Sequence, residues 1–298
     1  MTMALHVFPG QEAPAGRLAA ALEIAISPVA IRTFPDGESL VQVGEPGDIA
    51  LVYCSLDQPD TKLVRLLLAA SALRDRGAGK VILIAPYLCY MRQDQAFAPG
   101  EAVSQKVIGQ LLGAAFDGLV TVDPHLHRTP DLALAVPGIA VANVSAAPVI
   151  AAAIRGTIAP GTVLVGPDEE SRAWVASLGH ELGLGAIVGQ KRRIDDHRVE
   201  IVLPDAAQAA GRPALLVDDM VSSGGTLLKC AAQLAAAGAH VVGAVTTHCL
   251  AGEGELAALA RGGIASLLAT DTIPGPASTI PLATALAAAV RGLELAGR

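Results

Sequence analysis

Cysteine pairs, aromatic residues and charged residues are all scarce in this sequence. Of its 298 residues, 3% are aromatic, 16% are charged and 52% are apolar, a composition too apolar for a disordered protein. No two cysteines form a Cys-x-x-Cys pair, so the usual zinc-site spacing is absent, and a disulfide framework is not expected at this length. We therefore expect a reduced, cytoplasmic protein. The cysteines are Cys54, Cys89, Cys230 and Cys249.

Signals for export, membrane insertion and nucleic-acid binding are also missing. The first ten residues have neither the basic start nor the apolar core of a signal peptide. Residues 132–154 carry no charge over a membrane-spanning length, but they contain two prolines and are mostly alanine and valine, which favours a buried αβ crossover. The net charge of −7 argues against a broad nucleic-acid surface. We expect no membrane partner and no nucleic-acid partner.

Short apolar runs alternate with stretches rich in alanine and leucine along the whole chain. This alternation predicts parallel βαβ units, and the near-continuous apolar runs predict strands that are covered on both faces. We expect strands at residues 49–54, 80–86, 118–123, 161–165, 214–218 and 240–247. We expect helices at residues 63–76, 102–115, 170–181 and 226–237.

One part of the chain resembles another part that lies 164 residues later. The segments that begin at Leu51 and Leu215 each read as strand, nine-residue loop, amphipathic helix, Gly-Ala turn and strand. Coincidence is the alternative, because all βαβ units look alike. We favour a tandem of two similar α/β domains, at 1–145 and 146–284, followed by a C-terminal helix at 285–298 that packs back on the N-terminal domain.

The loop of the second segment has the composition of a sugar-phosphate site. Its glycines permit positive φ, and successive N–H groups at a helix N-terminus bind anions. Two acids just before the turn would repel a phosphate, but they accept hydrogen bonds from a sugar diol or hold a metal. The alternative is a capped turn with two solvated acids. The loop of the first segment, residues 54–60, has no glycine, so a single such site is expected in the C-terminal half. The predicted residues are Asp218, Asp219, Ser222, Ser223, Gly224, Gly225 and Thr226.

Five further polar segments stand at turns or just after predicted strands. Residues 34–38 read Phe-Pro-Asp-Gly-Glu, which by itself indicates an Asp-Gly hairpin turn. Residues 90–94 read Tyr-Met-Arg-Gln-Asp and follow a strand at its carboxyl end, where α/β sheets bind ligands. Residues 123–125 (Asp-Pro-His) and 166–168 (Gly-Pro-Asp) also follow predicted strands. Residues 191–193 (Lys-Arg-Arg) form the tightest basic cluster, which by itself indicates a solvated charge run.

The second loop resembles the signature of the type I phosphoribosyltransferase superfamily. Within it, the other segments resemble motifs of the ribose-phosphate diphosphokinases, also called phosphoribosyl diphosphate (PRPP) synthetases, over nearly the whole chain. The resemblance implies an α/β fold with two tandem phosphoribosyltransferase-like domains, each a mainly parallel sheet flanked by helices. It implies Mg²⁺-dependent transfer of the β,γ-diphosphoryl group of ATP to the C1 hydroxyl of ribose 5-phosphate, which gives PRPP and AMP.

The resemblance also implies roles for individual residues. Lys191 and Arg193 would be catalytic, in a loop that closes cations over the transferred group. His125 and Asp168 would hold Mg²⁺, the histidine through water. The ATP would lie near motifs of the first half, and the motif at 34–38 would reach the ATP of a neighbouring subunit, so a homo-oligomer with a shared ATP site is expected. The predicted ATP-binding residues are Phe34, Asp36, Glu38, Arg92 and Gln93.

Three departures from the family pattern keep two alternatives open. The family's pyrophosphate motif usually reads Ser-Pro-Asp-x-Gly-Gly, but here both glycines are gone and Glu169 and Glu170 add two carboxylates that would repel a diphosphate. Residues 95–101 lack the basic residues of many relatives, and Ser222-Ser223 replaces the commoner Asp-Thr. One alternative is therefore a non-catalytic or regulatory homologue. The other is a phosphoribosyltransferase that consumes PRPP.

Overall fold

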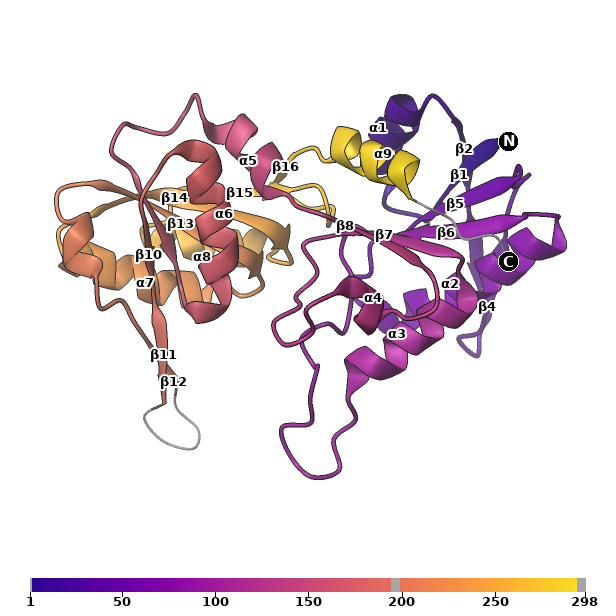
Figure 1. Ribbon diagram of the computed structural model, residues 1–298, viewed down its shortest axis with the longest axis horizontal. Coiled ribbons are helices and arrows are strands. Elements are labelled where there is room, and N and C mark those ends of the chain that lie inside the picture. Colours follow the sequence, from indigo (N-terminus) through magenta and orange to yellow (C-terminus); the bar gives the residue numbers. More distant parts are fainter. Residues whose placement is uncertain (1, 194–198, 294–298) are drawn as a thin grey trace. The chain divides into compact units, whose positions relative to one another are not determined.

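The chain folds into two compact units. The computed structural model describes residues 2–193 and 199–293. Unit 1 consists of residues 1–144 together with 282–298, and unit 2 consists of residues 145–281. Each unit has its own six-stranded sheet with helices packed against it (Figure 1). The fold class predicted from the sequence is therefore confirmed.

Unit 1 is built on a parallel sheet. Its strands are β1 (Met3–Val7), β2 (Ala25–Pro28), β5 (Ile49–Tyr53), β6 (Lys80–Ile84), β7 (Gly118–Val122) and β8 (Ala140–Val144). They lie in the order β2-β1-β5-β6-β7-β8, and every neighbouring pair is parallel. An antiparallel hairpin connects β2 to β5, with strands β3 (Ala30–Thr33) and β4 (Ser39–Gln42). The helices are α1 (Glu12–Leu22), α2 (Pro59–Asp75), α3 (Ser104–Ala115), α4 (Leu132–Ala135) and α9 (Ala283–Gly292).

Unit 2 repeats this plan. Its strands are β9 (Val163–Gly166), β10 (Ala186–Val188), β13 (Pro213–Val221), β14 (His240–Cys249), β15 (Leu267–Thr270) and β16 (Ser278–Ile280). They lie in the order β10-β9-β13-β14-β15-β16, again all parallel. A second antiparallel hairpin has strands β11 (Gln190–Arg193) and β12 (Val199–Val202). The helices are α5 (Ala147–Ile154), η1 (Glu169–Ser171), α6 (Arg172–Leu182), η2 (Ala206–Ala209), α7 (Gly225–Ala236) and α8 (Glu253–Arg261).

The internal repeat predicted from the sequence is a repeat of topology. In each sheet the second strand of the chain lies at the edge, the first lies beside it, and the remaining four follow in chain order. The segments that resemble each other, β5–α2–β6 and β13–α7–β14, therefore occupy the same place in their sheets. Each antiparallel hairpin also falls at the same point, between the second and third strands of its sheet.

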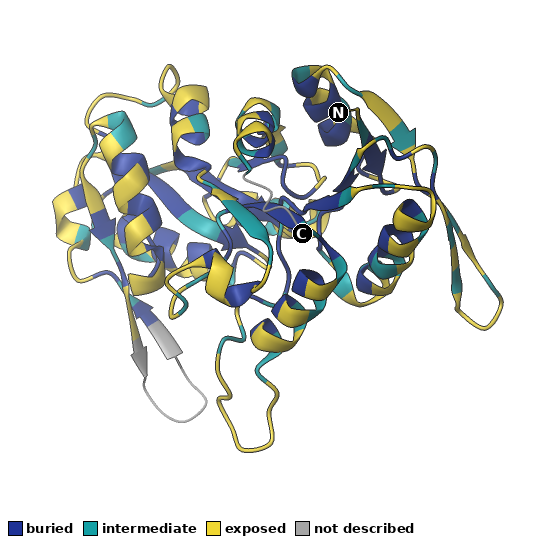
Figure 2. Ribbon diagram, turned by 45° about the vertical axis from the view of Figure 1, so that its right-hand side comes forward, coloured by how far each residue is buried: buried dark blue, intermediate teal, exposed yellow. Residues whose placement is uncertain are grey.

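Apolar spacing explains which faces are buried. The inner strands are dark blue in Figure 2, while the outward faces of the helices are yellow. On α2, the side chains that recur every three or four residues are buried against the sheet, which is the pattern of an amphipathic helix. These side chains belong to Leu63, Leu66, Ala69, Ala70 and Leu73. Helix α9, from the C-terminal end of the chain, packs within unit 1, where it contacts α1, β7 and β8.

Three sequence expectations need correction. The predicted strand 214–218 continues to Val221, and the predicted helix 170–181 begins as η1 and becomes α6 only at Arg172. The uncharged stretch 132–154 forms α4, β8 and α5, and β8 is a partly exposed edge strand rather than a fully buried crossover. In the part of the chain that the structure describes, no helix is both long and apolar enough to cross a membrane.

His6 makes the stability of unit 1 depend on pH. Its ring is fully buried in β1, and neither ring nitrogen has a hydrogen-bond partner among the described residues. Burial lowers the pKa of His6 from 6.5 to about 4, because it disfavours the charged form. The unfolded chain therefore takes up a proton near pH 6.5, whereas the folded chain does not do so until about pH 4.

We expect the wild-type protein to lose about 3 kcal/mol of stability relative to His6→Leu as the pH falls from 7.5 to 4.5. Leucine does not titrate and removes the two unpaired nitrogens. Urea unfolding of both full-length proteins at the two pH values measures the difference. Equal losses in both proteins would show that His6 does not carry this dependence.

Candidate active site

The two acids of the predicted sugar site lie within a strand and not in a loop. Strand β13 stays paired with β14 through this region, with Asp218 opposite Thr246 and Val221 opposite Cys249. The backbone N–H of Asp219 donates to Oδ1 of Asp218 at 3.1 Å. The prediction that the strand ends at Asp218 is wrong because this pairing continues for three more residues. The sheet therefore fixes the backbone of both acids.

Asp218 is buried close to two other carboxylates, those of Asp219 and Asp168. Burial, followed by the charges of Asp219 and Asp168, raises the pKa of Asp218 well above its usual value. Asp168 follows β9, the strand beside β13, so the ends of two adjacent strands contribute these acids. Hydroxyl donors or a cation would relieve the repulsion among them. The cluster is therefore suited to a sugar diol, to a metal ion, or to both.

The turn after β13 presents unpaired backbone donors. Gly224 is the N-cap of α7, no side chain caps the helix, and the first intrahelical bond runs from Leu228 N–H to Gly224 O at 3.0 Å. The amides of residues 225–227 consequently have no intrahelical acceptor. Among the described residues no other acceptor pairs with the amides of 222–227. With exposed Ser222, Ser223 and Thr226 around them, these amides are suited to an anion such as a phosphate.

Only glycine fits at position 224. Its φ is +73°, in the left-handed region. A Cβ built on it would lie 2.6 Å from Cδ2 of Leu259 on α8, which is closer than side chains approach each other. The backbone of the turn can therefore pass next to α8 while its N–H groups stay uncovered.

In the equivalent loop of unit 1, the backbone N–H of Ser55 already has a hydrogen-bond acceptor. The N–H of Ser55 donates to Oε1 of Gln11 at 2.6 Å, and the Gln11 amide nitrogen donates back to the Ser55 carbonyl at 3.3 Å. Lys62 donates to the same carbonyl at 2.8 Å and to Asp57 at 2.6 Å. The backbone N–H of Ser55 is therefore not available to an anion.

The two carboxylates that follow Asp168, Glu169 at the variable position of the family motif and Glu170 at a glycine position, are both paired with cations of unit 2. Glu169 accepts two hydrogen bonds from the Arg172 guanidinium, at 2.7 and 2.6 Å. Nζ of Lys191 lies 2.5 Å from Oε2 of Glu170 and 2.9 Å from Oδ2 of Asp168. The two added charges are thus largely compensated by neighbours in the same unit. The repulsion expected from the sequence is weaker than two free carboxylates would produce.

Lys191 is positioned by the β11–β12 hairpin, where it lies opposite Ile201. Partial burial lowers the pKa of Lys191, but the hydrogen bonds to Glu170 and Asp168 outweigh it and raise the pKa above its usual value. Lys191 therefore carries its positive charge at neutral pH. Arg193, the other predicted catalytic residue, is in the same strand, and its side chain lies outside the described residues.

In unit 1, residues 34–38 form the tip of the β3–β4 hairpin. Phe34 N–H donates to Glu38 O at 2.8 Å, and Gly37 donates to Phe34 O at 2.9 Å with a φ of +94°. Asp36 accepts from the N–H of Glu38 at 3.1 Å, and the Arg32 guanidinium lies 4.8 Å from the centre of the Phe34 ring. The Asp-Gly hairpin turn expected from the sequence is confirmed. Its two carboxylates are exposed at the tip.

The segment 90–94 is held in place by side-chain contacts within unit 1. Tyr90 has a φ of +62°, and its hydroxyl hydrogen-bonds to Asp60. Oε1 of Gln93 accepts from the Ser104 hydroxyl at 2.6 Å, while Arg92 is exposed. These contacts fix the backbone around Arg92 and leave its guanidinium accessible to a nucleotide.

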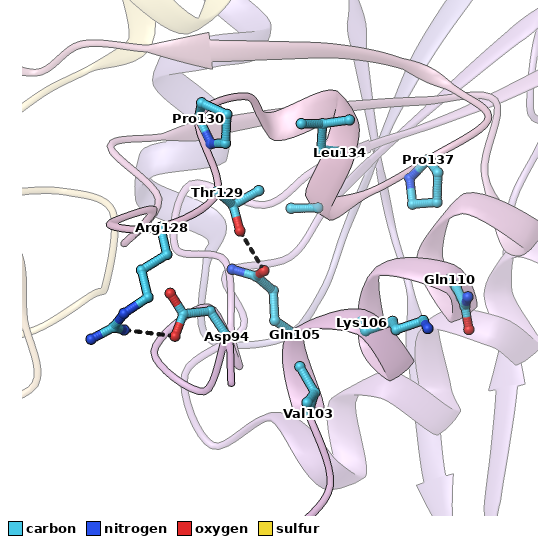
Figure 3. A pocket seen from close by; sticks show the side chains of 11 residues that line it. Asp94, Val103, Gln105, Lys106, Gln110, Arg128, Thr129, Pro130, Leu134 and Pro137 are labelled. Carbon is cyan, nitrogen blue, oxygen red and sulfur yellow. Dashed lines mark hydrogen bonds and ion pairs between the residues drawn. The ribbon is translucent and has the colours of Figure 1, made fainter. Parts of the chain in front are cut away.

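A pocket of about 440 Å³ opens beside this segment (Figure 3). At one side, Arg128 forms an ion pair of 2.9 Å with the almost fully buried carboxylate of Asp94. The next residue along the chain, Thr129, donates from its hydroxyl to Oε1 of Gln105 at 2.8 Å. Lys106, Gln110, Leu134 and Pro137 also line it. Arg92 and Gln93 are not among its lining residues, so the pocket adjoins the predicted nucleotide contacts without containing them.

His125 has a partner that the sequence analysis missed. It follows Asp123, whose φ is +34°, just after β7. Its Nε2 lies 2.6 Å from Nε2 of His127, and the rings meet edge-on with their centres 3.9 Å apart. One nitrogen therefore donates to the other. The His-x-His spacing was the available signal, and it was not used.

The predicted site residues divide between the two units. Unit 2 brings together Asp168, Lys191 and the two acids of β13 through ion pairs and electrostatic interaction. Unit 1 contains all five predicted ATP residues and His125. The two predicted Mg²⁺ ligands, His125 and Asp168, therefore belong to different units.

Two parallel sheets with one strand order, and a glycine turn after a strand that carries two acids near its carboxyl end, define a tandem of phosphoribosyltransferase-type units. Comparisons with known proteins agree. The family model "N-terminal domain of ribose phosphate pyrophosphokinase" matches residues 5–115, and "Phosphoribosyl transferase domain" matches residues 147–260. The crystal structure of phosphoribosylpyrophosphate synthetase from Mycobacterium smegmatis shares the fold, with a TM-score of 0.84, 24% identity and 98% coverage of each chain.

Comparison with curated relatives shows which family within this class the chain belongs to. A ribose-phosphate pyrophosphokinase of Methanopyrus kandleri is 34% identical over 93% of this chain and 95% of that relative. One of Thermococcus kodakarensis is 37% identical over 85% of this chain and 89% of that relative. The chain belongs to the ribose-phosphate pyrophosphokinase family, which is the diphosphokinase family that its motifs resemble.

Proposed function

We propose that this protein transfers the β,γ-diphosphoryl group of ATP to the C1 hydroxyl of ribose 5-phosphate and forms PRPP and AMP. The observation that carries the proposal is the row of unpaired amides at 222–227, which follows two strand-held acids in a chain of this family. The amides and the hydroxyls of Ser222, Ser223 and Thr226 bind the 5-phosphate. Asp218 and Asp219 accept hydrogen bonds from the ribose diol.

In the transfer, the C1 oxygen forms a bond to the β-phosphorus as the bond from that phosphorus to the bridging oxygen of the α-phosphate breaks. AMP leaves with the bridging oxygen, and the hydroxyl proton passes to water. Negative charge spreads over the transferred oxygens, so Lys191 and Arg193 lower the barrier by compensating it. Catalysis consists of alignment and charge compensation, without a covalent intermediate.

ATP is held by the residues of unit 1. The Phe34 ring stacks on adenine, Asp36 and Glu38 accept from its amino group, and Arg92 and Gln93 hold the nucleotide. Mg²⁺ supplies charge neutralisation across the phosphates. The acids around Asp218 fit such a cation, because burial and then the charges of Asp219 and Asp168 raise the pKa of that group, and a cation would offset both effects. Asp168 would offer the oxygen ligand that Mg²⁺ prefers, and His125 is the second residue proposed to hold the ion, through water.

Incubation of the purified protein with ATP, Mg²⁺ and ribose 5-phosphate tests the proposal. Equal amounts of AMP and PRPP, formed without any nucleobase, are the expected result. A PRPP-consuming phosphoribosyltransferase would release no AMP from these reactants and would require PRPP with a base. The absence of product with or without a base would favour a non-catalytic homologue.

We also propose that the active site is shared in a homo-oligomer, because the ATP motif at 34–38 is exposed at the tip of a hairpin. Phe34→Ala and Lys191→Met should each be nearly inactive. After mixing under conditions of subunit exchange, about one quarter of the sites would combine an intact hairpin from one subunit with an intact lysine from another. Activity that rises to that level supports sharing. A mixture that stays as inactive as its components contradicts it.

A further inference from the structure

Glu170 occupies a position where the family motif has glycine, and it contacts the predicted catalytic lysine. Nζ of Lys191 lies 2.5 Å from the Glu170 carboxylate and 2.9 Å from that of Asp168. An ammonium group has three hydrogens to donate. Two of them are directed at these carboxylates, which leaves one for any other acceptor. Lys191 is thus occupied within its own unit.

The two carboxylates that hold Lys191 differ in freedom. The Asp168 side chain is 11% exposed, and its Oδ1 accepts the N–H of Glu170 at 2.9 Å, which fixes it as the cap of η1. The Glu170 and Lys191 side chains are 43% and 44% exposed. The contact between Glu170 and Lys191 can therefore open towards solvent without disturbing the buried acids, whereas Asp168 stays in place.

A carboxylate at this position competes with the substrate. Glu170 and a diphosphoryl group both attract the ammonium group of Lys191, so one of them must release it. If Asp168 binds Mg²⁺ as proposed above, the metal also displaces the lysine from Asp168, and Glu170 remains as its resting partner. A glycine at this position would leave Lys191 free to close over the phosphates.

We propose that Glu170 is a positioning residue that restrains Lys191 while no diphosphate is bound and slows the transfer by the cost of releasing it. The inference rests on the proposed function for its kinetic consequence. Glu169 provides an internal comparison. It adds the same charge one residue earlier, but it binds Arg172 instead of Lys191.

The kinetic test compares Glu170→Gln with the wild type and with the matched control Glu169→Gln in single-turnover AMP formation. Exposed ion pairs contribute little, so we expect Glu170→Gln to react about two- to fivefold faster at low ionic strength and subsaturating ATP. The ratio should fall towards one in about 0.5 M salt, because salt screens the pair. Glu169→Gln should match the wild type, and Glu170→Gln should have no effect in a Lys191→Met background.

Three results would overturn the inference. One is a Glu170→Gln protein that is slower than, or equal to, the wild type at low salt. Another is an equal gain in Glu169→Gln, which would indicate a general effect of charge. The third is a gain that persists with Lys191→Met, which would mean that Glu170 repels the phosphates directly and does not act through the lysine.

Binding of inorganic pyrophosphate with Mg²⁺ provides a readout that does not depend on turnover. Calorimetry should show about two- to fivefold tighter binding by Glu170→Gln than by the wild type, and no difference in the Lys191→Met background. If the wild type forms no AMP, the proposed function is wrong. The calorimetric measurement then tests by itself whether Glu170 restrains Lys191. Equal affinities, or no binding by either protein, would overturn the inference.

Discussion

Replacing Lys191 with methionine should lower kcat by about 10²- to 10³-fold, the effect of removing one preorganised charge from a transition state. KM values for ATP and ribose 5-phosphate should change much less, because the charge that Lys191 compensates develops during the transfer. Methionine keeps most of the length of the side chain and removes only the ammonium group. We expect kcat to be sensitive because Lys191 contacts Asp168 and Glu170. These two acids follow β9, the strand that pairs with β13.

Lys229→Met is the matched control. Lys229 is exposed on α7 in the same unit, so the substitution removes an equal charge away from the acids. It should leave kcat within about twofold of the wild type. Steady-state AMP release with all substrates saturating measures both variants. A loss of less than tenfold in Lys191→Met would mean that the lysine does not stabilise the transition state.

The repeated sheets could be predicted because their inner strands are short apolar runs. Residues 49–53 and 80–84 have nearly no polar positions, and β-branched residues between turns indicate buried parallel strands. The six expected strands and four expected helices are all present. The other strands were not predicted, and they include the inner strands β1 and β15. Strands β2 and β3 have four residues each and are largely exposed, so neither length nor apolar content distinguishes them from loops.

The end of β13 shows how tertiary pairing overrides a local signal. Aspartate is depleted in strands, so two consecutive acids indicated a strand end at Asp218. The partner strand β14 continues as far as Cys249 and pairs with Val221, which keeps the acids in the ladder. No pattern within a window of ten residues contains that information, because the partner lies about thirty residues further along the chain.

The contacts of the candidate site are the least predictable part. From the sequence, Glu169 and Glu170 were two extra negative charges with no partners. Arg172 follows one of them by three residues, and that pair could have been found from helical spacing. Lys191 lies 21 residues after Glu170 and reaches it only because the β11–β12 hairpin brings the lysine next to the loop after β9. Such a pairing depends on packing between elements.

Gly224→Ala should raise the KM for ribose 5-phosphate by about tenfold or more and leave the KM for ATP nearly unchanged. The left-handed φ of +73° costs a residue with a Cβ about 1–2 kcal/mol, and the new methyl group would lie 2.6 Å from Leu259. The turn must therefore move away from α8, which misaligns the amides. Hydrogen bonds to a charged group are worth about 1.5–3 kcal/mol each, so loss of one bond to the phosphate accounts for the expected change.

Gly238→Ala separates backbone strain from loss of the phosphate site. Gly238 has a φ of +82° just after the other end of α7, and nothing lies within 4 Å of an added Cβ. The Gly238→Ala protein should lose stability through backbone strain alone and keep the wild-type KM for ribose 5-phosphate. Leu259→Ala combined with Gly224→Ala should recover part of the affinity, because it removes the steric conflict but not the strain. If Gly224→Ala keeps a normal KM for ribose 5-phosphate, or raises both KM values equally, the amides at 222–227 do not bind the sugar's phosphate.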